Sequence, residues 1–577
     1  MLRALASAFK FHGRQLLVGA SAAVAGSYSD CLKIDLEPAT AKSLRAALEA
    51  ALFDGCGQKL PVSLEDQKTL QATENDGARV ALLKSLFKTL YGDEPECISM
   101  AGGRVNLIGE HVDYPDVQFA GDPVVHLFSM GGAIQNNYLV AAGARTDGKV
   151  VICHTAVGEV FTVTLAELDK YEAEAVTQRE RHMPMKERST PQWAFHTLGA
   201  VKQMISSGVQ LPGLNLLLTS NVPHGAGMSN SAANCVALGL VFNNMFPALK
   251  LDSPIDLVTF ARRAENSSFA GGSCGWLDQL LIVCSNQGML TKIDYADRSV
   301  QHFKSKLPAD WQFVALNTNV PHVLAESDYS HRVRELTLGV EFLSKLRGKN
   351  TGGPSLKLGT INALLTAIDP DTPGNDPIDI ASLSDGALAQ FDTIKGEAGN
   401  DLSASEVQEV RAAVEASFVV PEDLPLHKGK TPLQSFGIIL RRMRHQKMSS
   451  LLVPLAGEAA EIGDAALFGA LLDLEGQSLR MSGDFMITGE NGAQDAMLDC
   501  ALAAGKELKI RVHGRMLGGG GGGNVLLFVD MSDVTLRRQW EGATCAKYNA
   551  WAEAKFPGQG IKATTIVPEI SAGARLL

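Results

Sequence analysis

The chain has 577 residues, of which 45% are hydrophobic and 20% are charged, values typical of a globular protein that is too long for a single ordinary core. Its formal net charge of -11, with 63 acidic residues against 52 lysines and arginines, argues against non-specific nucleic-acid binding, which depends on excess positive charge. No apolar run approaches the length of a membrane span, and nine scattered cysteines without a Cys-x-x-Cys pair predict a reduced compartment and no structural zinc. We therefore expect neither nucleic acid nor a membrane as a partner.

Residues 1–40 are predicted to form a leader segment, whose first 29 residues include no acidic residue. These residues include three basic ones, Arg3, Lys10 and Arg14. The apolar residues Leu2, Leu5 and Phe9 have the spacing of an opposing helical face. This pattern fits an organellar targeting segment and, equally well, a disordered N-terminus. We expect a cytoplasmic protein, with an organelle as the alternative if residues 1–29 act in targeting.

Beyond the leader, strand-like and helical segments alternate, which predicts a mixed α+β fold. We place a first domain at residues 41–300 and a second domain at 301–577, with an acidic insertion at about 350–430. Near the end of the second domain, Leu508–Val512 and Asn524–Val529 have the apolar pattern of two strands. The chain therefore predicts two cores of mixed secondary structure and a surface insertion in the second.

The first motif in chain order is Gly103–Tyr114, where polar side chains crowd the end of an apolar run. Its polar residues are Arg104, Glu110, His111 and Asp113. The pattern predicts a strand that ends in a charged loop. Carboxylate and imidazole groups can hold sugar hydroxyls, because each hydroxyl both donates and accepts hydrogen bonds. A strand end that is merely solvated is the alternative.

The second motif is a glycine-rich turn, Pro223–Ala233, between a predicted strand at Leu214–Thr219 and a predicted helix at Ala232–Phe242. The N–H groups and the positive dipole at a helix start attract phosphate, and Gly225 and Gly227 permit its close approach. The groups available to phosphate or Mg²⁺ are those of Ser229, Asn230 and Ser231. The alternative is a helix start whose serines only cap its first turn. The turn fits neither a Walker loop nor a Rossmann fingerprint.

The third motif is a run of six glycines, Gly518–Gly523, between the two predicted strands of the second domain. Glycine at this density indicates either close backbone approach and positive φ angles or a flexible linker. Because strand-like segments flank the run on both sides, the sequence favours a close-packed turn.

Together the three motifs resemble those of the GHMP small-molecule kinases, and most closely those of the galactokinase family. Gly103–Tyr114 is similar to the galactokinase signature almost residue for residue, Pro223–Ala233 resembles the phosphate loop, and Gly514–Asn524 resembles the closing glycine motif. The likeness runs in consistent order over about residues 98–529. It implies the two-domain α+β GHMP kinase fold, with an N-terminal domain like ribosomal S5 domain 2, a ferredoxin-like C-terminal domain, and the active site in the cleft between them.

The resemblance also implies an activity, the transfer of the γ-phosphoryl group of ATP to the C1 hydroxyl of galactose. Asp278 would act as the general base and Arg104 would keep it ionised. Sugar binding would involve Arg104, Glu110, His111, Asp113, Gly275, Asp278 and Tyr329. ATP would be bound by Trp193, Gly225, Ala226, Gly227, Met228, Ser229, Asn230 and Ser231, and Mg²⁺ by Ser231 and Glu265.

This sequence departs from the family pattern in two places that bear on function. Pro115–Leu127 is an insertion beside the expected sugar pocket, and Asn230 replaces a serine of the usual triple-serine loop. The sugar could therefore be galactose or a relative such as N-acetylgalactosamine or arabinose. A ligand-binding sensor that keeps the kinase fold is a third hypothesis, although the retained Ser229 and Ser231 favour catalysis. We expect a monomer that acts on a small-molecule sugar and ATP.

Overall fold

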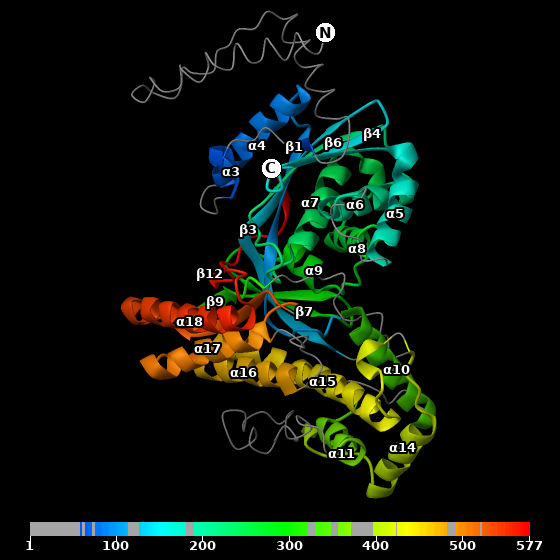
Figure 1. Ribbon diagram of the computed structural model, residues 1–577, viewed down its shortest axis with the longest axis vertical. Coiled ribbons are helices and arrows are strands. Elements are labelled where there is room, and N and C mark those ends of the chain that lie inside the picture. The colour runs from blue at the N-terminus through cyan, green and yellow to red at the C-terminus, as the bar shows by residue number, and fades with distance from the viewer. Residues whose placement is uncertain are drawn as a thin grey trace, which may run out of the picture. The chain divides into compact units, whose positions relative to one another are not determined.

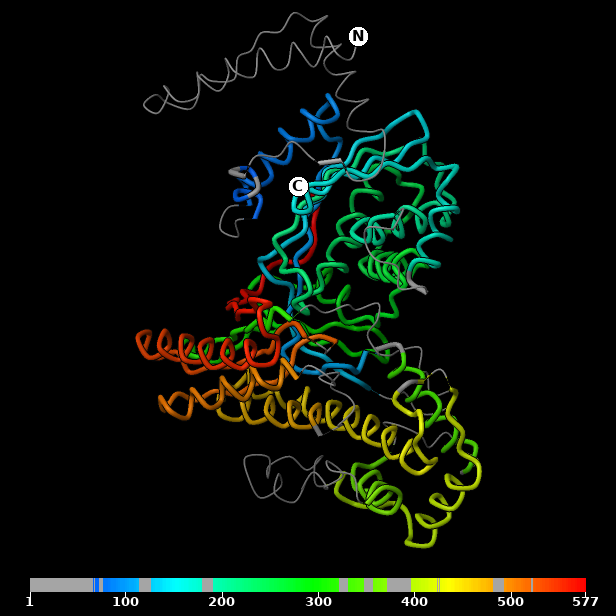
Figure 2. Tube along the Cα trace, viewed as in Figure 1, coloured from blue at the N-terminus to red at the C-terminus, as the bar shows by residue number. Residues whose placement is uncertain are grey.

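The computed structural model describes residues 58–59, 64–71, 76–113, 126–180, 190–320, 329–347, 356–370, 396–422, 424–481, 492–519 and 522–577 (Figures 1 and 2). The chain divides into two compact units, Met1–Asp54 and Gly55–Leu577, and all described residues belong to the second unit. The predicted leader at residues 1–40 and most of the insertion after Tyr114 therefore lie outside the described residues.

Nine strands of the described residues form a first sheet, which is antiparallel except where β4 pairs with β6. Its main path is β1 (Gln58–Lys59), β5 (Glu159–Thr164), β4 (Lys149–His154), β6 (Leu214–Ser220), β3 (Phe128–Ala144), β2 (Cys97–Ile108) and β13 (Arg575–Leu576). Two further strands belong to this sheet, because β7 (Leu290–Asp294) pairs with β3 and β8 (Ser299–Phe303) pairs with β7. The pairing of β13 with β2 returns the C-terminal end of the chain to the first sheet.

Helices cover both faces of the first sheet. On one face a core forms between the strands and α5 (Leu168–Glu180), α6 (Phe195–Ser206), α7 (Asn230–Met245) and α8 (Pro254–Glu265). The other face of β3 receives α4 (Asp76–Tyr91), which brings Phe87 against Gly143. Shorter elements near this sheet are α3 (Leu64–Gln71), α9 (Leu277–Cys284), η1 (Leu165–Glu167), η3 (Gln192–Ala194) and η4 (Pro247–Leu249). The helix start at α8 is fixed by a capping box between Ser253 and Asp256 and by Pro254 in the first turn.

A second, four-stranded sheet lies between two pairs of helices. Its order is β10 (Val512–Met516), β11 (Asn524–Asp530), β9 (Trp311–Asn317) and β12 (Thr564–Ile566), with antiparallel pairing throughout. Alternate residues of β11 face opposite sides, so that Leu526 and Phe528 pack with α15 (Pro432–Ile462) and α16 (Ala465–Met481). Val525 and Leu527 pack with α17 (Ala493–Leu508) and α18 (Val534–Lys555). Helix α16 contacts α15, and α17 contacts α18 (Figure 1).

The predicted insertion contains helices α11 (Leu358–Ile368) and α14 (Ala404–Ser417) and the short η7 (Pro425–His427) where the structure describes it. Helices α11 and α14, together with α10 (Tyr329–Arg347), which precedes the insertion, pack against the first half of α15. They share a separate apolar core that contains Leu336, Ile361, Val410 and Phe436. The division of the chain at residue 300 stays a prediction.

The predicted strand Leu508–Val512 is wrong. Helix α17 continues to Leu508, Lys509 turns the chain with a left-handed φ of 58°, and β10 begins only at Val512. The apolar residues Leu508 and Ile510 gave the segment its strand-like pattern, but both pack into the core beneath α17 and α18. The strand and helix predicted around Pro223–Ala233 and the strand predicted at Asn524–Val529 are confirmed.

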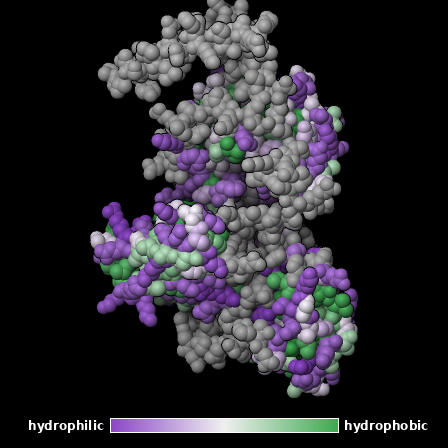
Figure 3. All heavy atoms as spheres, in the orientation of Figure 1, coloured by the Kyte–Doolittle hydropathy of each residue, from purple (hydrophilic) through white to green (hydrophobic). Residues whose placement is uncertain are grey.

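Hydrophilic residues predominate on the coloured surface in Figure 3, and hydrophobic residues form small separate areas. The exposed large hydrophobic residues of the described part of the chain are spread over several elements, as Val157, Leu346, Val419, Ile462, Val534, Leu576 and Leu577. Scattered apolar residues of this kind are normal on protein surfaces. Within the same described part, no helix is both long and apolar enough to cross a membrane.

Candidate active site

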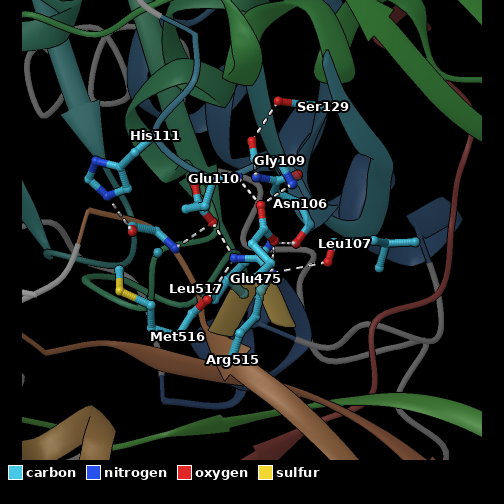
Figure 4. A network of polar contacts seen from close by, with 12 residues as sticks. Asn106, Leu107, Gly109, Glu110, His111, Ser129, Glu475, Arg515, Met516 and Leu517 are labelled. Carbon is cyan, nitrogen blue, oxygen red and sulfur yellow. Dashed lines mark hydrogen bonds and ion pairs between the residues drawn. The ribbon is translucent and has the colours of Figure 1, made fainter. Parts of the chain in front are cut away.

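The first predicted motif forms a buried turn at the end of β2. Gly109 begins the turn with a φ of 93°, and a Cβ atom there would lie 2.4 Å from the carbonyl oxygen of Phe128, so that only glycine fits. His111 has a φ of 57°, which is uncommon for a residue with a side chain. Its Nε2 lies 3.2 Å from the carbonyl oxygen of Gly518. The turn therefore places Glu110 and His111 against the glycine run of the second sheet (Figure 4).

Glu110 is held by two donors from the second sheet. Its Oε2 accepts hydrogen bonds from Arg515 Nη1 at 3.0 Å and from the backbone N–H of Gly518 at 3.1 Å. Burial alone would raise the pKa of Glu110, but the charges of Arg515 and Arg104 hold it below its usual value. Burial also lowers the pKa of His111 to about 4. At neutral pH the site thus combines an ionised carboxylate with a neutral imidazole.

Asp113 lies against the loop that leads into α9. Its Oδ2 accepts a hydrogen bond from the backbone N–H of Leu277 at 3.2 Å. A Cβ atom on Gly275 would lie 1.9 Å from the carbonyl oxygen of Asp113, so that the two backbones can approach only because Gly275 has no side chain. The structure thereby brings two predicted sugar-binding residues together across a gap of more than a hundred residues.

Asp278, in the first turn of α9, connects β2 with the glycine-rich turn. One carboxylate oxygen accepts a hydrogen bond from Arg104 Nε at 2.7 Å, and the other accepts one from the Ser229 hydroxyl. Arg104 also donates through Nη1 to the carbonyl oxygen of Gly227, and its backbone N–H donates to Met228 at 3.1 Å. Burial alone would lower the pKa of Arg104, but Asp278 and Glu110 raise it above its usual value. Arg104 is therefore a buried cation that holds Asp278 beside the turn.

The glycine-rich turn Pro223–Ala233 is built from left-handed residues. Gly225 and Gly227 have φ angles of 65° and 68°, and Ser229, just before α7, has a φ of 58°. The Ser229 side chain makes no capping hydrogen bond to the helix, which excludes the simple capped-helix interpretation. Asn230 Oδ1 instead accepts a hydrogen bond from the Ser220 hydroxyl at the end of β6, at 2.6 Å. The amide that replaces a serine is therefore anchored to the preceding strand.

The glycine run packs directly on this turn. A Cβ atom on Gly518 would lie 2.9 Å from the Cα of Gly227, and one on Gly523 would lie 3.1 Å from the carbonyl oxygen of Gly225. Both Gly518 and Gly523 have positive φ angles, of 84° and 83°. The linker interpretation is wrong at Gly518 and Gly523, because their backbone contact with the turn requires residues without side chains. Gly520 and Gly521 lie outside the described residues.

Ser231 and Glu265 form a pair of oxygen donors beside the turn. The Ser231 hydroxyl donates to Glu265 Oε1 at 2.6 Å, and Gln279 Nε2 donates to Glu265 Oε2 at the same distance. Burial and the neighbouring Asp278 raise the pKa of Glu265 to about 7. A hydroxyl and a carboxylate are ligand types that Mg²⁺ accepts together with phosphate oxygens. No cluster of three or more His, Cys, Asp or Glu side chains suited to a metal occurs in the part of the chain that the structure describes.

Trp193 lies at the same edge of the first sheet as the glycine-rich turn. It belongs to η3, and its Nε1 donates to Glu159 Oε2 at 2.7 Å while its ring packs edge-on to His154 at 5.8 Å. Strands β4 and β6 are parallel and pair His154 with Leu218, and β6 then runs into the turn.

Tyr329 is the first residue of α10, and its side chain lies outside the described residues.

Three buried residues of the second sheet and its helices were not predicted as part of the site. They are His445, Glu475 and Arg515, and each contacts the turn after β2. Arg515 could have been suspected from the sequence, because it lies two residues before Leu517, which precedes the glycine run. Glu475 lies in an ordinary amphipathic helix and gives no local signal in the sequence.

Two family models match the chain. The model described as GHMP kinases N terminal domain matches residues 195–286, and the galactokinase galactose-binding signature matches residues 85–118. These ranges contain the glycine-rich turn with Asp278 and the turn after β2, respectively.

The chain is also similar to curated galactokinases. It is 31% identical to that of Chloroflexus aurantiacus over 270 residues, which cover 47% of this chain and 61% of the relative. It is 28% identical to that of Streptomyces coelicolor over 493 residues, which cover 85% and 97%. The match to the Clostridium tetani galactokinase covers 59% of that protein, so the chain spans about three-fifths of the length of two of these relatives.

A solved structure shares the fold. The structure of Lactococcus lactis galactokinase complexed with galactose superposes with a TM-score of 0.57 at 21% identity, over 86% of this chain and 100% of the other. The chain thus has the α+β fold of the GHMP kinases. Through the galactose-binding signature and the galactokinase relatives, the chain is similar to the galactokinase family within that superfamily.

Proposed function

We propose that this protein phosphorylates galactose at its C1 hydroxyl with ATP as the phosphoryl donor. The observation that carries the proposal is the position of Asp278. Its two carboxylate oxygens bind Arg104 at the sugar-signature strand and Ser229 in the glycine-rich turn. A base for the sugar hydroxyl and a cradle for the ATP phosphates are therefore joined by one side chain.

In the proposed reaction the proton of the C1 hydroxyl passes to Asp278. The C1 oxygen forms a bond to the γ-phosphorus as the bond to the β-phosphate oxygen breaks, and ADP and galactose 1-phosphate result. Arg104 holds the Asp278 carboxylate in place, because its fork binds both that carboxylate and the Gly227 carbonyl.

Sugar recognition is assigned to Glu110, His111, Asp113, Gly275 and Tyr329. The neutral imidazole of His111 can both donate and accept, and the ionised Glu110 accepts, so that together they match hydroxyl groups. Asp113 contributes through its contact with the loop before α9, which links the sugar end of the site to Asp278.

ATP binding is assigned to the turn at Gly225–Ser231 and to Trp193 at the same edge of the sheet. Backbone N–H groups at the start of α7 would bind phosphate oxygens, aided by the helix dipole. Ser231 and Glu265 would hold Mg²⁺, which neutralises phosphate charge when it is bound. Cytoplasmic location and a monomeric state stay predictions.

The deciding experiment measures ADP release by the purified protein with galactose, N-acetylgalactosamine and arabinose, beside the Asp278→Asn variant. We expect the highest kcat/KM with galactose and loss of turnover in the variant. Loss of the reducing end of the sugar in the product identifies C1 as the phosphorylated position. Equal turnover by both proteins would refute the role of Asp278. Thermal stabilisation by galactose without any turnover would show a sensor instead.

A further inference from the structure

Glu475 is a fully buried carboxylate that contacts the sugar-binding turn from a distant helix. It lies on α16, and its Oε1 accepts hydrogen bonds from the backbone N–H groups of Gly109 at 2.7 Å and Glu110 at 3.0 Å. The hydroxyl of Ser449 on α15 donates to the same oxygen at 3.1 Å. Helix α16 can approach this closely because Gly476 has no side chain, since a Cβ there would lie 2.8 Å from the Gly514 carbonyl oxygen.

Arg515 on β10 completes the contact from the other side. Its Nε lies 3.0 Å from Glu475 Oε2, and its Nη1 lies 3.0 Å from Glu110 Oε2. The same guanidinium donates to the backbone carbonyls of Asn106 at 2.6 Å and Leu107 at 3.1 Å (Figure 4). Because Arg515 pairs with Leu526 across the strands, it points to the sheet face that meets β2. The guanidinium thus fixes both the end of β2 and the carboxylate of the turn.

From this arrangement we propose that Glu475 and Arg515 are positioning residues for sugar binding. Neither side chain needs to touch the sugar. Glu475 fixes the backbone of the turn, Arg515 fixes the Glu110 carboxylate, and the pair imposes on the turn the conformation in which Glu110 and His111 face the site. The inference rests on the proposed sugar-binding role of Glu110.

The electrostatics agree with a positioning role. The guanidinium of Arg515 lies between the carboxyl groups of Glu475 and Glu110, and all three side chains are 4% exposed or less. Burial raises the pKa of Glu475, and the neighbouring Arg515 opposes that rise. Burying ions is costly, and apolar residues of similar volume often stabilise a core at least as well. Stability alone therefore gives little reason for charges here, whereas a fixed orientation of Glu110 does.

The test compares Glu475→Gln with a matched buried pair elsewhere in the chain. Arg441 Nη1 lies 3.2 Å from Asp369 Oδ2, with side-chain exposures of 2% and 9%, and this pair joins the end of α11 to α15. Asp369→Asn is the control because it also removes one carboxylate from a buried ion pair. For Glu475→Gln we expect the Kd of galactose, measured by calorimetry without ATP, to rise about tenfold or more with the KM for ATP changed less than about twofold. In the control both values should stay within about twofold.

The outcomes separate the inference from the proposed function. If Glu475→Gln binds galactose as the wild type does, or if Asp369→Asn weakens galactose binding equally, the pair has no specific positioning role. Glu110→Gln tests the underlying assignment, because unchanged galactose affinity in that variant would refute the role of Glu110 itself. If Glu475→Gln does not fold, Arg515→Lys replaces it, because an ammonium keeps a positive charge beside Glu475 and Glu110 but cannot keep the forked contacts with Glu110 and the carbonyls of Asn106 and Leu107. Wild-type galactose affinity in Arg515→Lys would also overturn the proposal.

Discussion

Replacing Gly518 by alanine tests whether the glycine run must touch the glycine-rich turn Pro223–Ala233. The φ of 84° at this position is a left-handed conformation that costs an alanine about 1–2 kcal/mol. The added Cβ would also lie 2.9 Å from the Cα of Gly227, and overpacking of this kind costs about 1–3 kcal/mol. We therefore expect Gly518→Ala to lower the free energy of unfolding by about 2–5 kcal/mol in total.

Gly558 provides the matched control, because it has a φ of 77° but no atom within 4 Å of a Cβ placed there. Gly558→Ala should therefore show only the conformational cost of about 1–2 kcal/mol. Urea unfolding of both variants measures the difference, and steady-state kinetics measure the KM for ATP. We expect a raised KM for ATP in Gly518→Ala alone, since relief of the contact displaces Gly227. Equal losses of stability and equal KM values in the two variants would refute the reasoning.

Three further outcomes follow from the same contacts. Arg104→Lys should lower kcat about 10- to 100-fold, because an ammonium cannot keep the forked contacts with both Asp278 and the Gly227 carbonyl, and wild-type turnover would contradict this. Ser220→Ala should raise the KM for ATP about fivefold and leave the KM for galactose unchanged, because it removes the donor that anchors Asn230. His154 has a pKa lowered by burial to about 4 against an ordinary value of 6.5, so the unfolded state binds its proton first as the pH falls. His154 should therefore contribute a loss of roughly 2 kcal/mol in unfolding free energy between about pH 6.5 and 5, a loss that pH-dependent urea titrations should find missing in His154→Asn.

The motifs could be predicted from the sequence because their geometry is local. A strand that runs through a glycine-rich turn into a helix is specified by residues within about thirty positions of one another, and β6, the turn and α7 occur as expected. A close-packed turn could be favoured at the glycine run for the same reason, since strand-like segments flank the run. What the run contacts could not be predicted from its own residues.

The pairing of Arg104 with Asp278 could be inferred only through the family resemblance. The two residues are separated by 174 positions, and the sequence around one contains no feature that predicts contact with the other. Their contact depends on the register of β2 and on where α9 begins, which are properties of the whole first sheet. The wrong prediction of a strand at Leu508–Val512 has a related cause. Leu508 and Ile510 pack into the core beneath α17 and α18, and neither residue lies in a strand.

Glu475 shows most clearly what a single sequence leaves undetermined. The residue lies in a helix with apolar neighbours, where one glutamate ordinarily indicates a solvent-facing position. In the fold it is fully buried and accepts hydrogen bonds from a turn 366 positions away in the chain. Burial raises the pKa of Glu475, and Arg515, which reaches this carboxylate from β10, opposes that rise. The turn after β2 therefore contacts residues of the second sheet and its helices, so that the motif Gly103–Tyr114 marks the candidate site while Glu475 and Arg515, which contact it, come from elsewhere in the chain.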